Sequence, residues 1–469
     1  MDSVAIDPIA EDALRPAART IAGQQYSART AVAFVLLLLC LGQMTSALIP
    51  PLQSPDEPEH LKRAYLLSKG EVFLGGARDV TGGEIDTGLL DYIGTFQEFP
   101  FNYEKKMTHS VLRTSAAIQW SGKREFSDLF NTAFYFPLPY VPQAVAFAIG
   151  ERTGLTVQNS YYLARLLSLV VTLCLLCAAL LLYPTPLLVC AVFVTPMTLF
   201  QLGSASLDAV TFGLTGLAGA LFMRGACTKL SFTPLMHATL IICLFTLATS
   251  RIALIALTPL PLMLYVLRGS RTYLVWSALL IVLSTSWILY ALATVKGLPT
   301  RDLSTTQIME YYLLQPLSLL QVFFATITNG VIVEGYWNMF VGILGWLDTP
   351  LGSEVYIAFA ILFGLLAALS IQRRWRVSRG SLALIAAAVC SALLMFFIEL
   401  VTFNPHPAKV IDYLHGRYFI PIVILLAYPV LGHRLSPWEE RVGVSVLFVM
   451  IIVSIVGMIP RLLARYWMA

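Results

Sequence analysis

Long apolar runs separated by short polar segments occupy most of this chain. After a polar N-terminal stretch, the runs cover residues 31–48, 160–182, 186–201, 207–223, 235–249, 252–267, 272–294, 354–371, 381–401, 416–432 and 442–460. About 20 mostly apolar residues are needed to cross the hydrocarbon core of a bilayer. The pattern therefore predicts an all-α integral membrane protein with about 11 full spans, in a bundle of about 11–13 transmembrane helices.

Two further apolar stretches are not typical of full spans. Residues 135–150 are short and interrupted by prolines, which break helices. Residues 315–350 contain several polar side chains, among them Glu334, Asn338 and Asp348. Irregular backbone at membrane depth is tolerated only inside protein or beside water. We expect both stretches to be interfacial or re-entrant rather than full crossings.

Charged residues are concentrated in one loop directly after the first span. Residues 51–134 hold 21 of the 58 charged side chains and no cysteine. The predicted organisation is a cytoplasmic tail (1–29), a first transmembrane helix (30–50), an extracytoplasmic loop with juxtamembrane helices (51–134) and a multi-helix transmembrane domain (135–469). The loop is long enough to fold as a small cap without disulfides.

Composition and charge indicate the class of protein and its orientation in the membrane. Hydrophobic residues make up 57% of the chain and charged residues 12%, roughly half the charge of a soluble protein. The Lys and Arg residues lie in short loops, which excludes a nucleic-acid-binding stripe. Short cytoplasmic loops carry the excess of positive charge. The basic loops 224–229, 268–271, 372–379 and 432–441 therefore predict a cytoplasmic N-terminus and an external C-terminus.

The start of the external loop carries the densest group of titratable residues. Pro58 suits a first helical turn and Gly70 a helix stop, which predicts a short helix along the membrane surface. Asp56, Glu57 and His60 lie at its beginning. Helix capping is the simplest interpretation of these acids, because carboxylates favour helix N-termini.

The predicted topology adds charged residues from other spans. Arg165, Asp208, Arg251, Glu399 and Arg417 each lie near the external end of a different apolar run. Several arginines on the side that is usually poor in positive charge indicate one polar site under the loop, able to bind an anionic headgroup. Four basic residues of the loop are more typical of a solvated face: Lys105, Lys106, His109 and Arg113. Five aromatic residues are more typical of an interfacial aromatic belt: Trp120, Tyr135, Tyr140, Tyr161 and Tyr162.

Several segments resemble known families. The acidic pair after the first span, the Pro-Leu-Pro-Tyr segment at 137–140 and the Ala-Arg-Leu at 164–166 resemble GT-C glycosyltransferases. Four segments resemble a bacterial family of multi-pass membrane proteins of unknown function that is placed near that superfamily: residues 55–60 (PDEPEH), 199–208 (LFQLGSASLD), 345–349 (GWLDT) and 415–421 (HGRYFIP). The resemblance extends over nearly the whole chain.

The resemblance implies transfer of a sugar from a polyprenyl-phosphate donor to a glycan or lipid-linked acceptor at the external face of a bacterial cytoplasmic membrane. Asp56 matches the catalytic aspartate of GT-C enzymes, with Glu57 as the alternate. Asp56 would accept the proton of the acceptor hydroxyl with inversion at the anomeric carbon. Arg417, Arg251 and Arg165 would bind the phosphate.

The remaining substrate-binding candidates are His60, Asp208 and Tyr418, with Asp208 orienting an arginine or a sugar hydroxyl. The first loop lacks a DxD motif, so a divalent cation has no support from the sequence. The leading alternative is a transporter or flippase of a lipid-linked or polar solute, which would favour charges near mid-bilayer and a two-fold repeat. A third is a non-catalytic envelope scaffold in which the charged residues cap helices.

Overall fold

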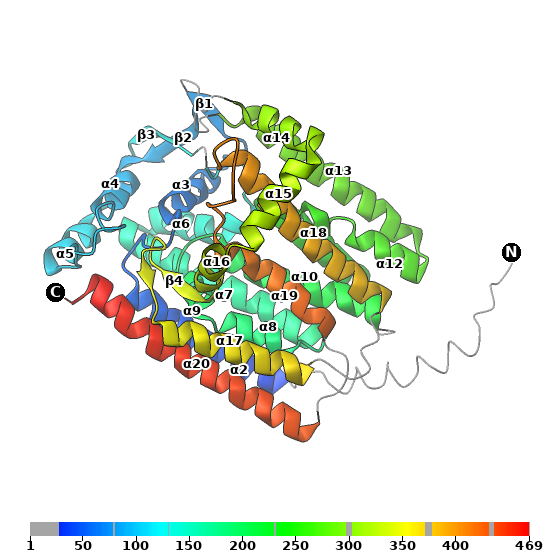
Figure 1. Ribbon diagram of the computed structural model, residues 1–469. Coiled ribbons are helices and arrows are strands. Elements are labelled where there is room, and N and C mark those ends of the chain that lie inside the picture. Colours follow the sequence, from blue (N-terminus) through cyan, green and yellow to red (C-terminus); the bar gives the residue numbers. More distant parts are fainter. Residues whose placement is uncertain are drawn as a thin grey trace, which may run out of the picture.

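The computed structural model describes residues 28–77, 80–129, 131–228, 231–296, 303–370, 378–430 and 436–468. Residues 1–27 of the predicted N-terminal tail, residues 372–377 of one basic loop and residues 432–435 of another lie outside these ranges. Seven helices in the described part are long and apolar enough to cross a membrane: α2 (Ala28–Leu48), α7 (Val157–Leu182), α10 (Asp208–Cys227), α13 (Arg271–Thr294), α17 (Ser353–Ser370), α18 (Arg379–Thr402) and α20 (Pro437–Tyr466). They form a helical bundle (Figure 1).

Four of the expected full spans are instead short or interrupted helices. Residues 186–201 form α8 (Leu187–Phe193) and α9 (Pro196–Leu202), and residues 235–249 form the 17-residue α11 (Pro234–Ser250). The other two runs form η2 (Ile252–Leu257) with α12 (Leu260–Arg268), and η3 (Gly416–Phe419) with α19 (Ile420–Ala427) and η4 (Tyr428–Val430). Proline in the first turn starts α9, α12 and α19, because a proline cannot continue a preceding helix.

Neither of the two doubtful stretches forms one continuous helix. Residues 135–150 form η1 (Leu138–Tyr140) and α6 (Val141–Thr153). After α14 (Thr305–Leu314), helices α15 (Pro316–Ile327) and α16 (Gly330–Gly342) are bent by 68°. Gly416 at the start of η3 packs against α16 so closely that a Cβ there would lie 2.0 Å from the carbonyl oxygen of Tyr336. The bent pair therefore supports the segment that carries Arg417.

The loop of residues 51–134 folds as a cap over one end of the bundle (Figure 1). It contains α3 (Glu57–Ser68), β1 (Gly75–Ala77), β2 (Val80–Asp86), α4 (Thr87–Thr95), α5 (His109–Ala117) and β3 (Arg124–Asp128), with the strands antiparallel in the order β1-β2-β3. Buried Ile85, Leu89, Tyr92, Phe96 and Phe99 form its core. A second short hairpin, β4 (Ile343–Leu344) with β5 (Thr349–Pro350), follows α16.

Helix α10 lies at the centre of the bundle and is buried along nearly its whole length. Small residues let its neighbours approach closely, as is common between helices in membranes. A Cβ at Gly219 would lie 2.5 Å from the ring of Tyr428, and one at Gly213 would lie 2.9 Å from the carbonyl oxygen of Thr172. The polar first turn of α10 is thus held firmly under the cap.

Basic loop residues gather at the end of the bundle away from the cap. Arg268 donates to the carbonyl of Gly225 at 2.7 Å, and Gly380 packs against Ala226. The described part of α2 begins at this end, whereas α20 finishes at the cap, where Trp467 donates to the carbonyl of Leu48 at 2.8 Å. The two described ends of the chain lie at opposite ends of the bundle.

Candidate functional site

Asp56 occupies the N-cap position of α3 but does not cap the helix. Its backbone is left-handed, with φ 62°, and its side chain forms no capping hydrogen bond. Left-handed backbone is uncommon outside glycine, although aspartate tolerates it better than most residues. Instead, Oδ2 of Asp56 lies 3.2 Å from Nη2 of Arg417. The side chain is 41% exposed, so it can meet both the arginine and a ligand.

Two arginines and a second aspartate lie beneath Asp56. Arg251 follows α11, Arg417 lies in η3 and Asp208 begins α10. Asp208 pairs with both arginines, through Oδ1 to Nη2 of Arg251 and through Oδ2 to Nη1 of Arg417 at 3.8 Å. The side chain of Arg417 is 3% exposed. We call Asp56, Asp208, Arg251 and Arg417 the charged cluster.

The charged cluster has hydrogen-bonding capacity to spare. Within the described part of the chain, Nε of Arg251 and both Nε and Nη1 of Arg417 are buried without a hydrogen-bond acceptor. Buried donors are nearly always satisfied in folded proteins, and guanidinium groups match the oxygens of phosphate and carboxylate. The arrangement is therefore suited to receive an anion.

Tyr418 orients both guanidinium groups. The Cζ atoms of Arg251 and Arg417 lie 4.5 Å and 5.2 Å from the centre of its ring. A cation over an aromatic face is attracted by the negative potential of the ring. Tyr418 thus helps to keep two like charges close together.

Neutral histidines border the charged cluster. His60 shares a 2.7 Å hydrogen bond with the hydroxyl of Tyr140, and its ring lies 6.4 Å from that of Tyr135. Burial lowers the pKa of His60 to about 4, although the nearby carboxylates of Asp56 and Asp208 oppose the shift. Burial, reinforced by Arg417, also lowers the pKa of His415 to about 4. Both imidazoles are neutral near pH 7, and they line the site as hydrogen-bonding rather than charged groups.

Glu57 and Arg165 are held apart in their own buried network. The Glu57 carboxylate is fully buried and accepts from the Tyr161 hydroxyl at 2.9 Å and from the Ala205 amide at 2.7 Å. Arg165, 3.5 Å from Glu57, donates to the carbonyls of Ser46, Ile49 and Pro50 at the end of α2. Carbonyls at a helix end need such donors.

This geometry revises two predicted roles. Glu57, expected as the alternate base, and Arg165, expected as a phosphate ligand, are both occupied in fixing the turn that presents Asp56. Glu399 also lies outside the charged cluster, since no ion pair joins it to these residues in the described part. Asp56, Asp208, Arg251 and Arg417 come together as predicted, with His60 and Tyr418 beside them.

The aromatic residues are more deeply involved than the predicted interfacial belt implies. Tyr140 and Tyr161 are completely buried, and their hydroxyls bind His60 and Glu57. Tyr140 belongs to the Pro-Leu-Pro-Tyr segment and Tyr161 lies shortly before Arg165, but neither position indicates a buried hydrogen bond to His60 or Glu57. The lysines at 105 and 106 contact Glu98 and the end of α20 instead. Among the described residues, no three His, Cys, Asp or Glu side chains are grouped so as to bind a metal ion.

The bundle of apolar helices and the charged cluster under its cap define a multi-pass α-helical membrane protein. More particularly, the chain belongs to the DUF2142 family of predicted membrane proteins, whose family model matches residues 39–426. The match includes every member of the charged cluster. No curated protein and no solved structure matches the chain significantly.

Proposed function

We propose that this protein is a GT-C-type membrane glycosyltransferase, which moves a sugar from a polyprenyl-phosphate donor to an acceptor hydroxyl. The observation that supports the proposal best is a partly exposed carboxylate, Asp56, set against two buried arginines that have unused donors. A carboxylate beside an anion site provides the base and the leaving-group stabilisation that this reaction needs.

In the proposed reaction, the acceptor oxygen forms a bond to the anomeric carbon as the bond from that carbon to the phosphate oxygen breaks. The bonding electrons leave with the phosphate, whose negative charge is stabilised by Arg251 and Arg417. Asp56 takes the proton of the acceptor hydroxyl and later returns it to water. The attack comes from the face opposite the phosphate, so the configuration is inverted.

Donor binding would break the ion pair between Asp56 and Arg417. Phosphate oxygens compete with the Asp56 carboxylate for the guanidinium, because phosphate accepts bidentate hydrogen bonds from arginine. Asp56 is then released towards the acceptor. Asp208 is buried beneath both arginines and keeps them aligned throughout.

The proposed location is the cytoplasmic membrane of a bacterium, with the N-terminus in the cytoplasm and the charged cluster outside. Its support is the position of Arg224 and Arg268 at the end of the bundle opposite the cap, together with the positive-inside rule.

The test is transfer of radiolabelled sugar from polyprenyl-phosphate donors to crude envelope acceptor by purified protein. Wild type should transfer sugar, Asp56→Asn should not, and Asp91→Asn, which changes an exposed carboxylate of the same cap, should behave as wild type. Turnover that survives in Asp56→Asn refutes the proposed base. Movement of donor lipid in proteoliposomes without any transfer would favour the flippase alternative.

A further inference from the structure

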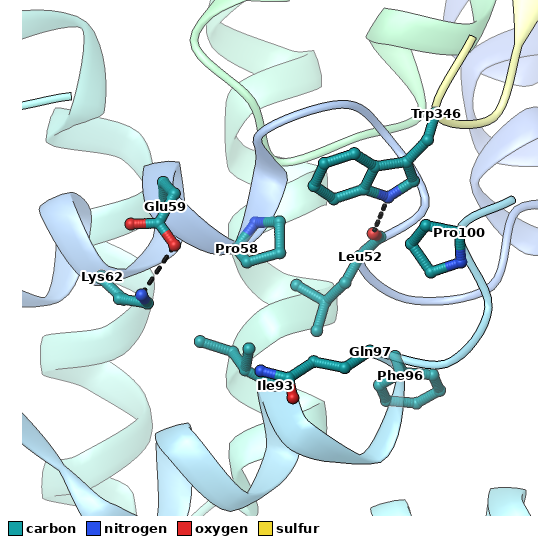
Figure 2. Close-up of a pocket in the computed structure, with 9 residues that line it drawn as sticks. All are labelled: Leu52, Pro58, Glu59, Lys62, Ile93, Phe96, Gln97, Pro100 and Trp346. Atoms are coloured by element: carbon teal, nitrogen blue, oxygen red, sulfur yellow. Dashed lines mark hydrogen bonds and ion pairs between the residues drawn. The ribbon is translucent and has the colours of Figure 1, made fainter. Parts of the chain in front are cut away.

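A cavity lies on the cap side of the molecule, beside the loop that carries Asp56. It has a volume of about 200 Å³ and is lined by Leu52, Pro58, Glu59, Lys62, Ile93, Phe96, Gln97, Pro100 and Trp346. Figure 2 shows α4 on one side, the indole of Trp346 on the other, and the Glu59–Lys62 pair at one end. Pockets for drug-sized ligands measure roughly 300–1,000 Å³, so this cavity accommodates a group the size of a single ring.

The polar lining is an incompletely used ion pair. Nζ of Lys62 lies 2.7 Å from Oε1 of Glu59, and Lys62 is only 8% exposed. An ammonium carries three donors and a carboxylate several acceptor positions, so one contact leaves most of this capacity for a ligand. Burial also raises the pKa of Glu59, while Lys62 opposes the shift.

The Gly345-Trp-Leu-Asp-Thr349 motif builds the opposite wall. Gly345 has φ 63°, and a Cβ there would lie 2.2 Å from Oδ1 of Asp348. Oδ2 of Asp348 accepts from the Phe101 amide and from Nη2 of Arg465, both at 2.9 Å. These contacts fasten the hairpin to the segment after α4.

The indole of Trp346 is fixed by the same turn. Its Nε1 donates to the Leu52 carbonyl at 3.1 Å, so the ring is anchored and its face borders the cavity (Figure 2). The proposed reaction makes no use of this motif. The motif places a rigid aromatic surface opposite a partly buried ion pair.

The lining chemistry selects among ligand classes. Glu59 and Lys62 cancel in charge, so an anion gains nothing here that the charged cluster does not provide better. A hydrocarbon tail would cover two charged groups without bonding them, which is costly. A neutral ring that bears hydroxyl groups satisfies both, since its hydroxyls donate to Glu59 and accept from Lys62 while its apolar face contacts Trp346 and Phe96.

We propose that this cavity binds one neutral sugar ring of the acceptor glycan. The assignment of the sugar to the acceptor rests on the proposed function, because the donor phosphate is assigned to the charged cluster. Pro58 connects the two sites: it lines the cavity and lies in the first turn of the helix that follows Asp56. The cavity is thereby an acceptor subsite beside the proposed base.

The experiment is saturation-transfer NMR of the full-length protein in a detergent without a sugar headgroup, using methyl glycosides of glucose, galactose, mannose and arabinofuranose as probes. At least one glycoside should bind. Glu59→Gln and Trp346→Phe should each weaken it about tenfold, because the first removes a charge-assisted hydrogen bond and the second removes the Nε1 anchor that holds the ring against the cavity. Glu98→Gln, a change at an exposed carboxylate next to the cavity residue Gln97, should leave binding unchanged.

Binding of no glycoside, or equal binding by wild type, Glu59→Gln and Trp346→Phe, overturns the assignment. Gln97→Ala provides a further variant at an exposed position, in case a change at either of the partly buried residues prevents folding. Asp56→Asn separates the two proposals. If it binds glycoside yet transfers sugar as wild type does, the proposed base fails while the subsite stands. If it abolishes transfer but the cavity variants keep the acceptor KM of wild type, only the subsite fails.

Discussion

The adjacent acids Asp56 and Glu57 should respond in opposite ways to removal of their charge. Glu57 is fully buried, accepts three hydrogen bonds from protein groups and lies 3.5 Å from Arg165. Removing one partner of a buried ion pair costs about 3–5 kcal/mol, because the other charge is left uncompensated. Asp56 has a 41% exposed side chain and one ion pair, so its loss should cost less than about 1 kcal/mol of stability.

The two amide variants therefore separate folding from catalysis. Glu57→Gln should lower the apparent melting temperature in detergent by roughly 5 °C or more, given about 2–4 °C per kcal/mol for chains larger than small domains. Its folded fraction should still transfer sugar within a few-fold of wild type. Asp56→Asn should melt within about 2 °C of wild type and lose roughly 10²–10⁴-fold in turnover, the usual contribution of a general base.

The measurement is a thermal scan at one fixed heating rate, because unfolding of such proteins is often irreversible, followed by the transfer assay on the monodisperse fraction. Asp91→Asn is the matched control for both readouts. A large loss of stability in Asp56→Asn, or full folding with complete inactivity in Glu57→Gln, would show that the two roles have been assigned the wrong way round.

Three further outcomes follow from the same geometry. Arg417→Lys should raise the donor KM about tenfold, because an ammonium cannot reproduce the bidentate geometry of guanidinium; the exposed Arg113→Lys is the control, and an unchanged KM would exclude Arg417 from donor binding. Stability should fall as pH drops from 6.5 towards 4, because His60 and His415 become protonated in the unfolded state but stay neutral in the folded protein. Each histidine contributes at most about 3 kcal/mol to this loss of stability. His60→Gln should flatten this dependence in melting scans, and an equally steep slope in that variant would contradict the assignment. Gly345→Ala should cost about 1–3 kcal/mol through backbone strain and the clash with Asp348, whereas Gly364→Ala, in open space on α17, should be neutral or slightly stabilising in the same scans.

Local signals in the sequence were enough to predict some elements closely. Helix α3 ends at Ser68, and Gly70 adopts φ 84°, as expected of a helix stop. The length of an apolar run did not predict a continuous helix where proline interrupts the run. Residues 186–201 have the hydropathy of a span, yet Thr195 caps a new helix at Pro196. Hydrophobicity reports that a segment avoids water, not that its backbone is continuous.

The sequence predicted only in part which residues belong to the charged cluster. The predicted topology alone brings Asp56, Asp208, Arg251 and Arg417 to one end of the bundle, because each lies near the predicted external end of its apolar run. The same rule includes Arg165, whose guanidinium turns instead to the carbonyls that end α2. Which acceptor a buried arginine reaches depends on packing a few ångströms away, and no local pattern encodes that choice. The cavity beside Trp346 likewise depends on three segments distant in sequence.

The attachment of α20 to the cap has a consequence for biogenesis. The carbonyls of Ala464 and Arg465 accept from Lys106, and that of Tyr466 accepts from the Met107 amide, so residues more than 350 positions apart close the same surface. A chain is synthesised from its N-terminus onwards. The cap is therefore not attached to the bundle through these contacts until α20 has been synthesised. Ribosomal products that stop before α20 would display an unfastened cap, a distinctive target for the quality-control proteases of the membrane.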